Sequence, residues 1–177
     1  LQAQGRLIDP EMKYEPIAPT AQRSLVAVRQ GEERRKIVRE ALEGIDKRVR
    51  GGLKGKEYVV IKPNIVSTKN QLASTHADAL RGILDYLDGR FKGPVLIAES
   101  SAGTTREGFE TFLYNRLAGE YKKLKVKLVD LNEEGQYKLI DLLSPELHVQ
   151  PVRLAARLMD PAGYQICAAI MKTHNTV

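Results

Sequence analysis

Tyr58-Val-Val-Ile-Lys-Pro-Asn64 is the stretch of sequence that decides the fold. Its β-branched centre predicts a buried strand, and Pro63 ends that strand between a cation and a carboxamide. A second apolar run, Tyr164–Met171, passes into Lys172 and Asn175 in the same manner. In open α/β sheets, ligands bind in the crevice beyond the carboxyl ends of the strands. Two strands that each end in lysine and asparagine therefore predict one shared site for an anion.

Strand-like and helix-like segments alternate along the chain. The predicted strands are Leu25–Arg29, Tyr58–Ile61, Val95–Ala98, Lys125–Leu131, a short edge strand Val152–Leu158, and Tyr164–Met171. The first predicted helix is Glu32–Arg50, which Gly51-Gly52 would end. The second begins near Ser74 or Thr75, where Thr75 and Asp78 have the spacing of a capping box. The third is Arg106–Leu117. Apolar strands without alternation predict a mostly parallel, doubly wound, Rossmann-like α/β sheet flanked by helices.

Both ends of the chain carry expectations about its organisation. Residues 1–23 contain three prolines and little periodicity, so we expect an extended arm there and an α/β domain over 24–177. Val177 follows directly on the polar tip of the last predicted strand. We therefore expect a sheet that is incomplete at its C-terminus, as in the N-terminal part of a larger domain. Leu1 in place of methionine fits a processed or truncated start.

Composition narrows the functional classes. With 42% apolar and 28% charged residues, the sequence is typical of a folded globular protein and excludes disorder throughout. No apolar run approaches the roughly 20 residues of a membrane-spanning helix. The net charge of +6 favours anionic partners. Basic residues are dispersed among acidic ones, however, so we do not expect a nucleic-acid partner. Cys167 stands alone, which excludes an internal disulfide, and its apolar neighbours predict a small core residue.

Three loops that leave strand ends carry the candidate chemistry. Lys62 and Asn64 would hold and orient an anion, and the loop Ser100, Ser101, Gly103 and Thr104 would add hydroxyl and helix N-terminal donors. Glu99 would serve as a metal ligand or general base. Lys172, His174 and Asn175 form the third loop, and His76 opens a helix nearby, so Lys172, His76 and His174 are candidates for proton transfer. The alternatives are ordinary: a solvated lysine, a threonine-capped helix and structural histidines.

Four motifs occur in a characteristic order: Val59–Asn64, Ser74–Leu80, Ile97–Gly103 and Lys172–His174. Together they resemble the Domain of Unknown Function 362 family, from about Leu25 to the C-terminus. The resemblance implies this fold and this site location, and a long C-terminal half after the Lys-Thr-His motif. Some family members carry ferredoxin-like iron–sulfur modules, and some carry twin-arginine export signals. A single cysteine cannot ligate such a cluster, so no iron–sulfur cluster bound by this chain alone is expected and its cofactor stays unknown.

The leading hypothesis is a domain that binds a small anionic molecule, phosphate or carboxylate, with Lys and His acid–base chemistry. The alternative is a non-catalytic module that contacts a redox partner or an assembly, in an iron–sulfur-associated protein. Nucleic-acid binding through the basic surface comes third. An incomplete sheet would pair with a C-terminal half or with a second copy as a homo-oligomer. The expected location is cytoplasmic, or exported after removal of an N-terminal signal.

Overall fold

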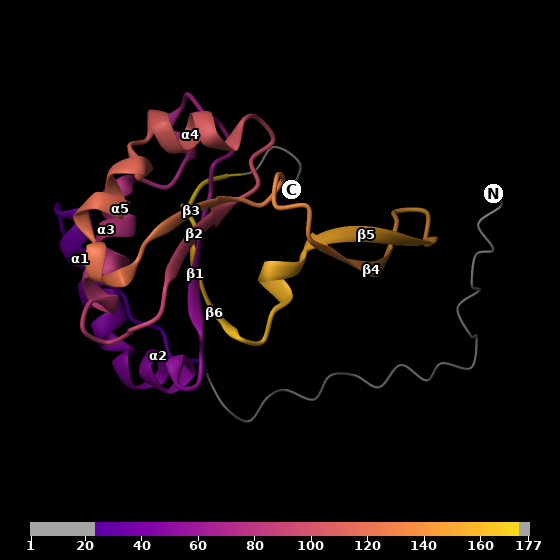
Figure 1. Ribbon diagram of the computed structural model, residues 1–177. Coiled ribbons are helices and arrows are strands. Elements are labelled where there is room, and N and C mark those ends of the chain that lie inside the picture. The colour runs from indigo at the N-terminus through magenta and orange to yellow at the C-terminus, as the bar shows by residue number, and fades with distance from the viewer. Residues whose placement is uncertain (1–23, 174–177) are drawn as a thin grey trace.

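A parallel four-stranded sheet forms the centre of the computed structural model, which describes residues 24–173 (Figure 1). The sheet contains β1 (Tyr58–Pro63), β2 (Val95–Glu99), β3 (Lys127–Asp130) and β6 (Gly163–Ala168), in the order β3-β2-β1-β6. Every pair of neighbours is parallel. The parallel α/β fold predicted from the sequence is thus confirmed, and the carboxyl ends of the strands share one edge. The predicted arm, residues 1–23, lies outside the described residues.

The helices lie over one face of this sheet (Figure 1). They are α1 (Arg34–Gly44), α2 (Asp46–Leu53), α3 (Ala77–Leu87), α4 (Thr105–Thr111) and α5 (Leu117–Glu120), with the short 3-10 turns η1 (Gln71–Ala73), η2 (Tyr114–Arg116) and η3 (Lys122–Leu124) between them. The connection from β3 to β6 passes over the opposite face and carries the 3-10 turn η4 (Ala156–Met159). None of the described helices has the length and hydrophobicity needed to cross a membrane.

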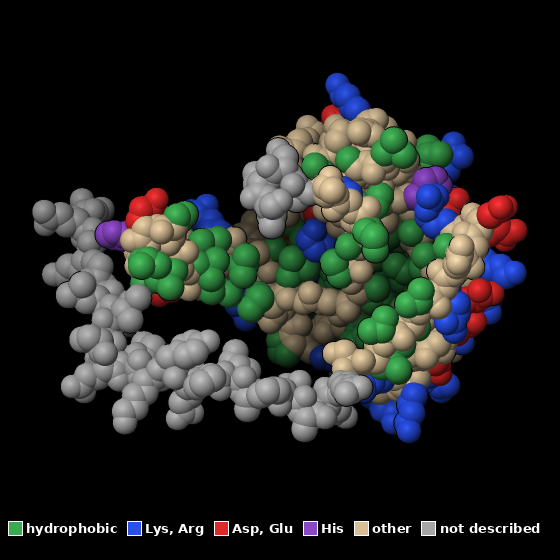
Figure 2. Space-filling view, turned by 180° about the vertical axis from the view of Figure 1, so that it is seen from behind, with side chains coloured by type: hydrophobic (Ala, Val, Ile, Leu, Met, Phe, Trp, Pro, Cys, Tyr) green, Lys and Arg blue, Asp and Glu red, His purple; other side chains and the backbone are tan. Residues whose placement is uncertain are grey.

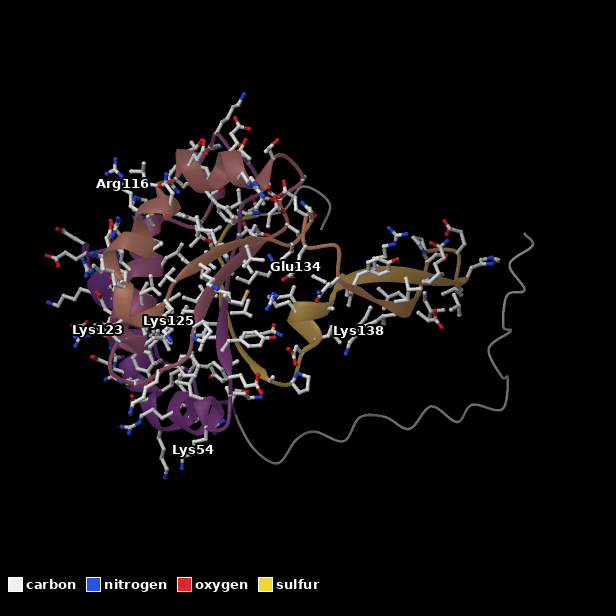
Figure 3. The ribbon with its side chains drawn as sticks, in the orientation of Figure 1. Lys54, Arg116, Lys123, Lys125, Glu134 and Lys138 are labelled. Atoms are coloured by element: carbon white, nitrogen blue, oxygen red, sulfur yellow. The ribbon has the colours of Figure 1, made fainter. Side chains whose placement is uncertain are left out.

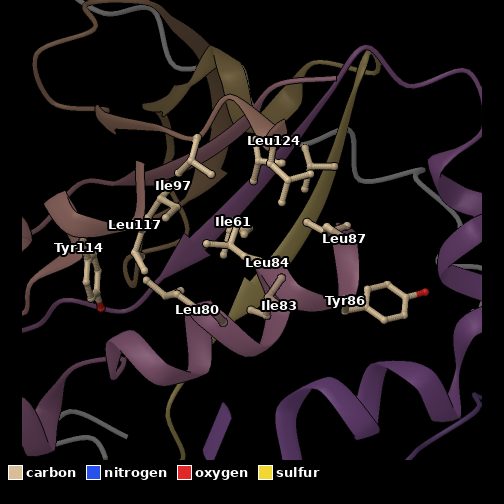
Figure 4. Packing of buried hydrophobic residues seen from close by; sticks show 14 of the residues in the cluster. Ile61, Leu80, Ile83, Leu84, Tyr86, Leu87, Ile97, Tyr114, Leu117 and Leu124 are labelled. Atoms are coloured by element: carbon tan, nitrogen blue, oxygen red, sulfur yellow. The ribbon is translucent and has the colours of Figure 1, made fainter. Parts of the chain in front are cut away.

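Side chains from alternate strand positions build two apolar layers. Val59, Ile61 and Ile97 face the helices and pack with Leu80 and Leu84 of α3 in the larger layer (Figure 4). The intervening positions Val60 and Ala98 belong to a smaller layer on the opposite face, to which η4 contributes Leu158. Because both faces are covered, the strands read as continuous apolar runs, which is typical of parallel sheets.

A separate antiparallel hairpin interrupts the connection between β3 and β6. Its strands are β4 (Tyr137–Leu143) and β5 (Val149–Ala155), paired from Tyr137 with Ala155 to Leu143 with Val149. The hairpin extends away from the sheet and helices (Figure 1). The predicted edge strand Val152–Leu158 is therefore wrong in both bounds and partner. The residues after Ala155 form η4, and the true partner strand β4 lies in a region where the sequence shows no clear pattern.

Three further expectations about local structure are wrong. Leu25–Arg29 forms no strand and belongs to neither sheet. The helix predicted over Glu32–Arg50 divides at Ile45, whose ψ of 19° breaks the helical path, and α2 continues through Gly51-Gly52 to Leu53. The helix predicted over Arg106–Leu117 ends at Thr111, and Leu113 takes a left-handed φ of 61°.

Cys167 was expected in the core but is exposed. It lies in β6 between Ile166 and Ala168, which pack toward the helices. Since successive side chains of a strand alternate between faces, Cys167 projects to the opposite face, beside its register partner Lys62. The apolar run around Cys167 does not show which of its side chains lie on the face of β6 that the helices cover.

Candidate functional site

The tips of β1 and β6 lie side by side at the carboxyl edge of the sheet. Lys62 pairs in register with Cys167, and Pro63 with Ala168. The segments that carry Asn64 and Lys172 therefore leave the sheet from adjacent strands, as the sequence predicted. Lys172 is exposed. His174 and Asn175, the remaining members of the third loop, lie outside the described residues and stay predictions.

Thr75 joins these two strand tips. Its hydroxyl accepts a hydrogen bond from Asn64 N at 2.9 Å and donates one to Ala168 O at 2.6 Å. Thr75 N donates to Asn64 O at 2.9 Å, and the hydroxyl of Tyr114 donates to Thr75 O. Thr75 is only 3% exposed. The predicted role of Thr75 as a helix cap is thus wrong, because its hydroxyl is engaged by β1 and β6.

Tyr114 supports Thr75 from the buried side of the site. Its ring is fully buried and lies near Phe109 and Phe112. Burial raises the pKa of the Tyr114 phenol, and the nearby Glu99 carboxylate raises it further. The phenol therefore stays protonated and remains a hydrogen-bond donor at neutral pH. Sequence reasoning missed Tyr114 because its link to Thr75 spans 39 positions and leaves no local pattern.

His76 caps α3. Its Nδ1 accepts the backbone N–H of Asp78 at 3.0 Å, and the Asp78 carboxylate lies 3.4 Å from the same nitrogen. A ring nitrogen that accepts a hydrogen bond carries no proton, so the neutral ring bears its proton on Nε2. His76 therefore keeps one donor for a ligand while its other nitrogen holds the helix start. Its side chain is 37% exposed.

Lys62 and Glu99 form an ion pair across β1 and β2. Lys62 Nζ lies 2.9 Å from Glu99 Oε1, which also accepts Ser100 N at 2.8 Å, and Glu99 Oε2 accepts Ile65 N at 3.2 Å. The Glu99 side chain is 4% exposed and that of Lys62 is 33% exposed. Both oxygens of Glu99 are thus engaged in holding Lys62 and the loops after β1 and β2. This arrangement gives Glu99 a positioning part in the site.

Asn64 brings an unsatisfied polar atom to the strand tips. Its Oδ1 is buried and has no hydrogen-bond partner among the described residues. A buried polar atom without a partner costs about 1–3 kcal/mol, so such an atom favours a bound group that supplies the missing hydrogen bond. A half-turn of the carboxamide exchanges Oδ1 for the donor Nδ2. Asn64 can therefore meet either a protonated or an ionised ligand oxygen.

The loop after β2 mostly satisfies its own polar groups. Ser101 is 7% exposed, its N donates to Thr105 Oγ1 at 3.2 Å, and its hydroxyl lies 3.1 Å from the same oxygen. Ser100, Gly103 and Thr104 are exposed, and the Thr104 side chain caps no backbone N–H. The loop stays beside Lys62 through the contact of Ser100 N with Glu99. Its exposed members, rather than Ser101, are the ones available to a ligand.

Within residues 24–173, histidine, cysteine, aspartate and glutamate side chains form no group of three or more that could hold a metal ion.

Comparison with protein families gives a match over residues 59–177, about two thirds of the chain, to the family described as Domain of unknown function (DUF362). The match begins inside β1 and includes the strand tips, whereas α1 and α2 precede it. No curated protein matches the chain, and no solved structure matches it. Because the matched region covers more than half of the sequence, the chain belongs to the family Domain of unknown function (DUF362).

Proposed function

We propose that this protein binds a small anionic molecule, a phosphate or a carboxylate, at the carboxyl tips of β1 and β6. The observation that carries the proposal is the strand order. The chain steps from β1 through β2 to β3 and then returns to the far side of β1 as β6. The carboxyl end of such a switch point is where open α/β sheets bind ligands. Lys62, Asn64 and Lys172 all follow or end these two strands.

Several cations and hydrogen-bond donors at the carboxyl ends of β1 and β6 favour a bound anion. Glu99 offsets the positive charge of Lys62, whose ammonium donates to Glu99 Oε1 and, at 3.3 Å, to Pro63 O, and keeps its third proton for a ligand. Lys172 is exposed and adds a cation, while Asn64 offers a carboxamide. The exposed loop residues Ser100, Gly103 and Thr104 supply further polar groups at the same edge. His76 Nε2 is the group with the chemistry for proton transfer to a bound ligand.

Calorimetric titration of the whole chain with inorganic phosphate and with acetate tests this proposal. Lys172→Ala removes an exposed cation without leaving a buried partner unpaired, so it isolates the ligand contact. We expect this variant to lose roughly tenfold in affinity, since a hydrogen bond to a charged group contributes about 1.5–3 kcal/mol. Lys62→Met, which keeps most of the side-chain volume, should lose as much. Unchanged affinity in both variants would exclude the site.

Exposed lysines distant from the strand tips provide the matched control. Lys54 and Lys123 are exposed and lie at the margin of the helical side of the protein (Figure 3). Lys123→Ala changes the net charge by the same amount as Lys172→Ala but should leave the affinity within a factor of two, because screening weakens distant surface charges. An equal loss in Lys123→Ala would mean that the protein attracts anions through its net charge rather than through a site.

The second candidate is a non-catalytic assembly role, favoured by the hairpin β4–β5. Hydrophobic side chains cover the hairpin, which stands apart from the body (Figure 2). Leu139, Leu143 and Leu147 are 62%, 56% and 73% exposed. Two-stranded hairpins are marginal on their own in water, and β4 and β5 have no further strand beside them among the described residues. A mass measurement by light scattering over a range of concentrations tests whether two copies associate, and Leu139→Lys should then abolish the association.

A further inference from the structure

A cavity of about 380 Å3 opens beside the strand tips. It lies between the start of α1, the segment that leads from η1 into α3, and Ala169–Met171, which follow β6 directly. Small-molecule sites in proteins have volumes of about 300–1,000 Å3, so this volume suits a small organic ligand. Lys172 is the next residue after the wall formed by Ala169–Met171. The cavity therefore adjoins the proposed anion site.

The described residues that line this cavity include a guanidinium and an imidazole but no carboxylate. Arg34, the first residue of α1, and His76 both line it, and no aspartate or glutamate is among its described lining residues. Arg34 is exposed, and its guanidinium takes part in no ion pair within residues 24–173. The contrast with the larger cavity of about 530 Å3 beside β3 is clear, because that one is lined by Glu110, Asp130, Glu133 and Glu134. Charge complementarity directs an anion to the first cavity and not to the second.

Besides Gln71, Ser74 and Thr75, the other residues that line this cavity are apolar. Val38, Leu72, Ala79, Ile170 and Met171 are among them. Leu72 is 85% exposed and Met171 is fully exposed, so two large apolar side chains stand in water at the mouth of the cavity. Inorganic phosphate would leave these side chains in water. A ligand with an apolar body would cover them and gain the free energy of apolar burial.

We infer that the ligand of this site is an amphipathic organic anion, with a phosphate or carboxylate head on an unbranched alkyl chain. The inference rests on the proposed function and specifies its ligand class. The head binds Lys172 and the polar groups of the strand tips, with Arg34 and His76 Nε2 beside it. The alkyl chain lies against Val38, Leu72 and Ile170. Each methylene that becomes buried raises affinity about fourfold.

Calorimetric titrations of the whole chain with inorganic phosphate, butyl phosphate and hexyl phosphate test this inference. Hexyl phosphate should bind roughly fifteenfold more tightly than butyl phosphate, because two more methylenes are buried. Ala79→Leu fills the cavity from α3 and should remove that preference while leaving the affinity for inorganic phosphate unchanged. Ala118→Leu, an exposed position on α5, is the matched control and should keep the preference.

The outcomes separate this inference from the proposed function. Inorganic phosphate could bind with an affinity that Lys172→Ala lowers, while the length of the alkyl chain has no effect on affinity. In that case the anion site stands and the inference about ligand class is overturned. A chain-length preference that survives in Ala79→Leu also overturns it. If neither Lys172→Ala nor Lys62→Met changes the affinity for inorganic or hexyl phosphate, the proposed function itself fails. Hexanol serves as a neutral probe, and binding as tight as that of hexyl phosphate would overturn the role assigned to the charged head.

Discussion

Asp85 shows how one carboxylate joins three elements of this fold. Arg35 of α1 donates to it from Nε at 2.5 Å and from Nη2 at 2.8 Å, and the Tyr121 hydroxyl donates at 2.6 Å. These contacts link α3, which carries Asp85, to α1 and to the residue that follows α5. The Arg35 hydrogen bonds, with help from Tyr121, hold the pKa of Asp85 below its usual value, although partial burial acts in the opposite direction.

Asp85→Asn should lower the free energy of unfolding at pH 7 by about 2 kcal/mol, because it removes hydrogen bonds between charged groups. Since the folded-state pKa of Asp85 is depressed, its contribution is fully present above the unfolded value of about 3.9 and is lost as pH falls through the folded value. The difference between wild type and variant should therefore shrink below about pH 4. Urea unfolding at pH 7 and pH 3 measures this. The exposed Asp88→Asn is the control, and a deficit at pH 3 as large as that at pH 7 would contradict the electrostatic explanation.

At the scale of single residues, the sequence placed the candidate residues at strand ends but did not show the contacts among them. Lys62, Asn64 and Lys172 were predicted at strand tips because proline and polar residues end apolar runs there. The bond from Thr75 to Ala168 spans 93 positions, and the pair of Lys62 with Glu99 spans 37. Such partners depend on the order of strands in the sheet, which no local pattern contains. The exposure of Cys167 depends on the same order.

At the scale of elements, α1 and α3 pack closely because Gly82 has no side chain. A β-carbon built on Gly82 would lie 2.5 Å from Arg35 O and 2.9 Å from the Val38 β-carbon. Real β-carbons do not approach other atoms so closely, and the nearest atom belongs to backbone that cannot rotate away. The close approach of the two helices therefore requires glycine at this position.

Gly82→Ala should destabilise the protein by about 2 kcal/mol through overpacking, although alanine is the better helix former. Gly119→Ala in α5 provides the opposite case, because its β-carbon would meet nothing within 4 Å. That control should be neutral or more stable by up to about 1 kcal/mol. Chemical unfolding of the two variants compares them directly. If both substitutions were stabilising, helix propensity would outweigh packing at Gly82, contrary to the structure.

Strands and helices were predictable to different degrees. The strands β1, β2, β3 and β6 appear within a few residues of their predicted bounds, since buried parallel strands give uninterrupted apolar runs. The break at Ile45 and the left-handed Leu113 were not predicted, because apolar residues continue at helical spacing through both positions. Leu25–Arg29 has the composition of a strand, but a strand also needs a neighbour with which to share hydrogen bonds.

At the scale of the whole molecule, the apolar core and the proposed site lie in different regions. The apolar core lies between the sheet and the helices, and its members come from residues 49–168 without β4 or most of β5. The proposed site occupies the carboxyl edge of the same sheet. Cations such as Lys54, Arg116 and Lys138 are spread over the surface (Figure 3). This dispersed charge agrees with a local anion site better than with a continuous basic surface for nucleic acid.

The hairpin β4–β5 should be energetically separate from the rest of the molecule. Leu139→Ser should change the free energy of unfolding by less than about 0.5 kcal/mol, because Leu139 already stands in water. Leu84→Ala should cost about 2–5 kcal/mol, because Leu84 is fully buried in α3.

In native-state hydrogen exchange, amides of β4 and β5 should exchange through local opening, with far less protection than those of β1 and β2. Protection of the hairpin equal to that of β1 in dilute solution would show that it unfolds with the core. Protection that appears only at high protein concentration would instead support the assembly role.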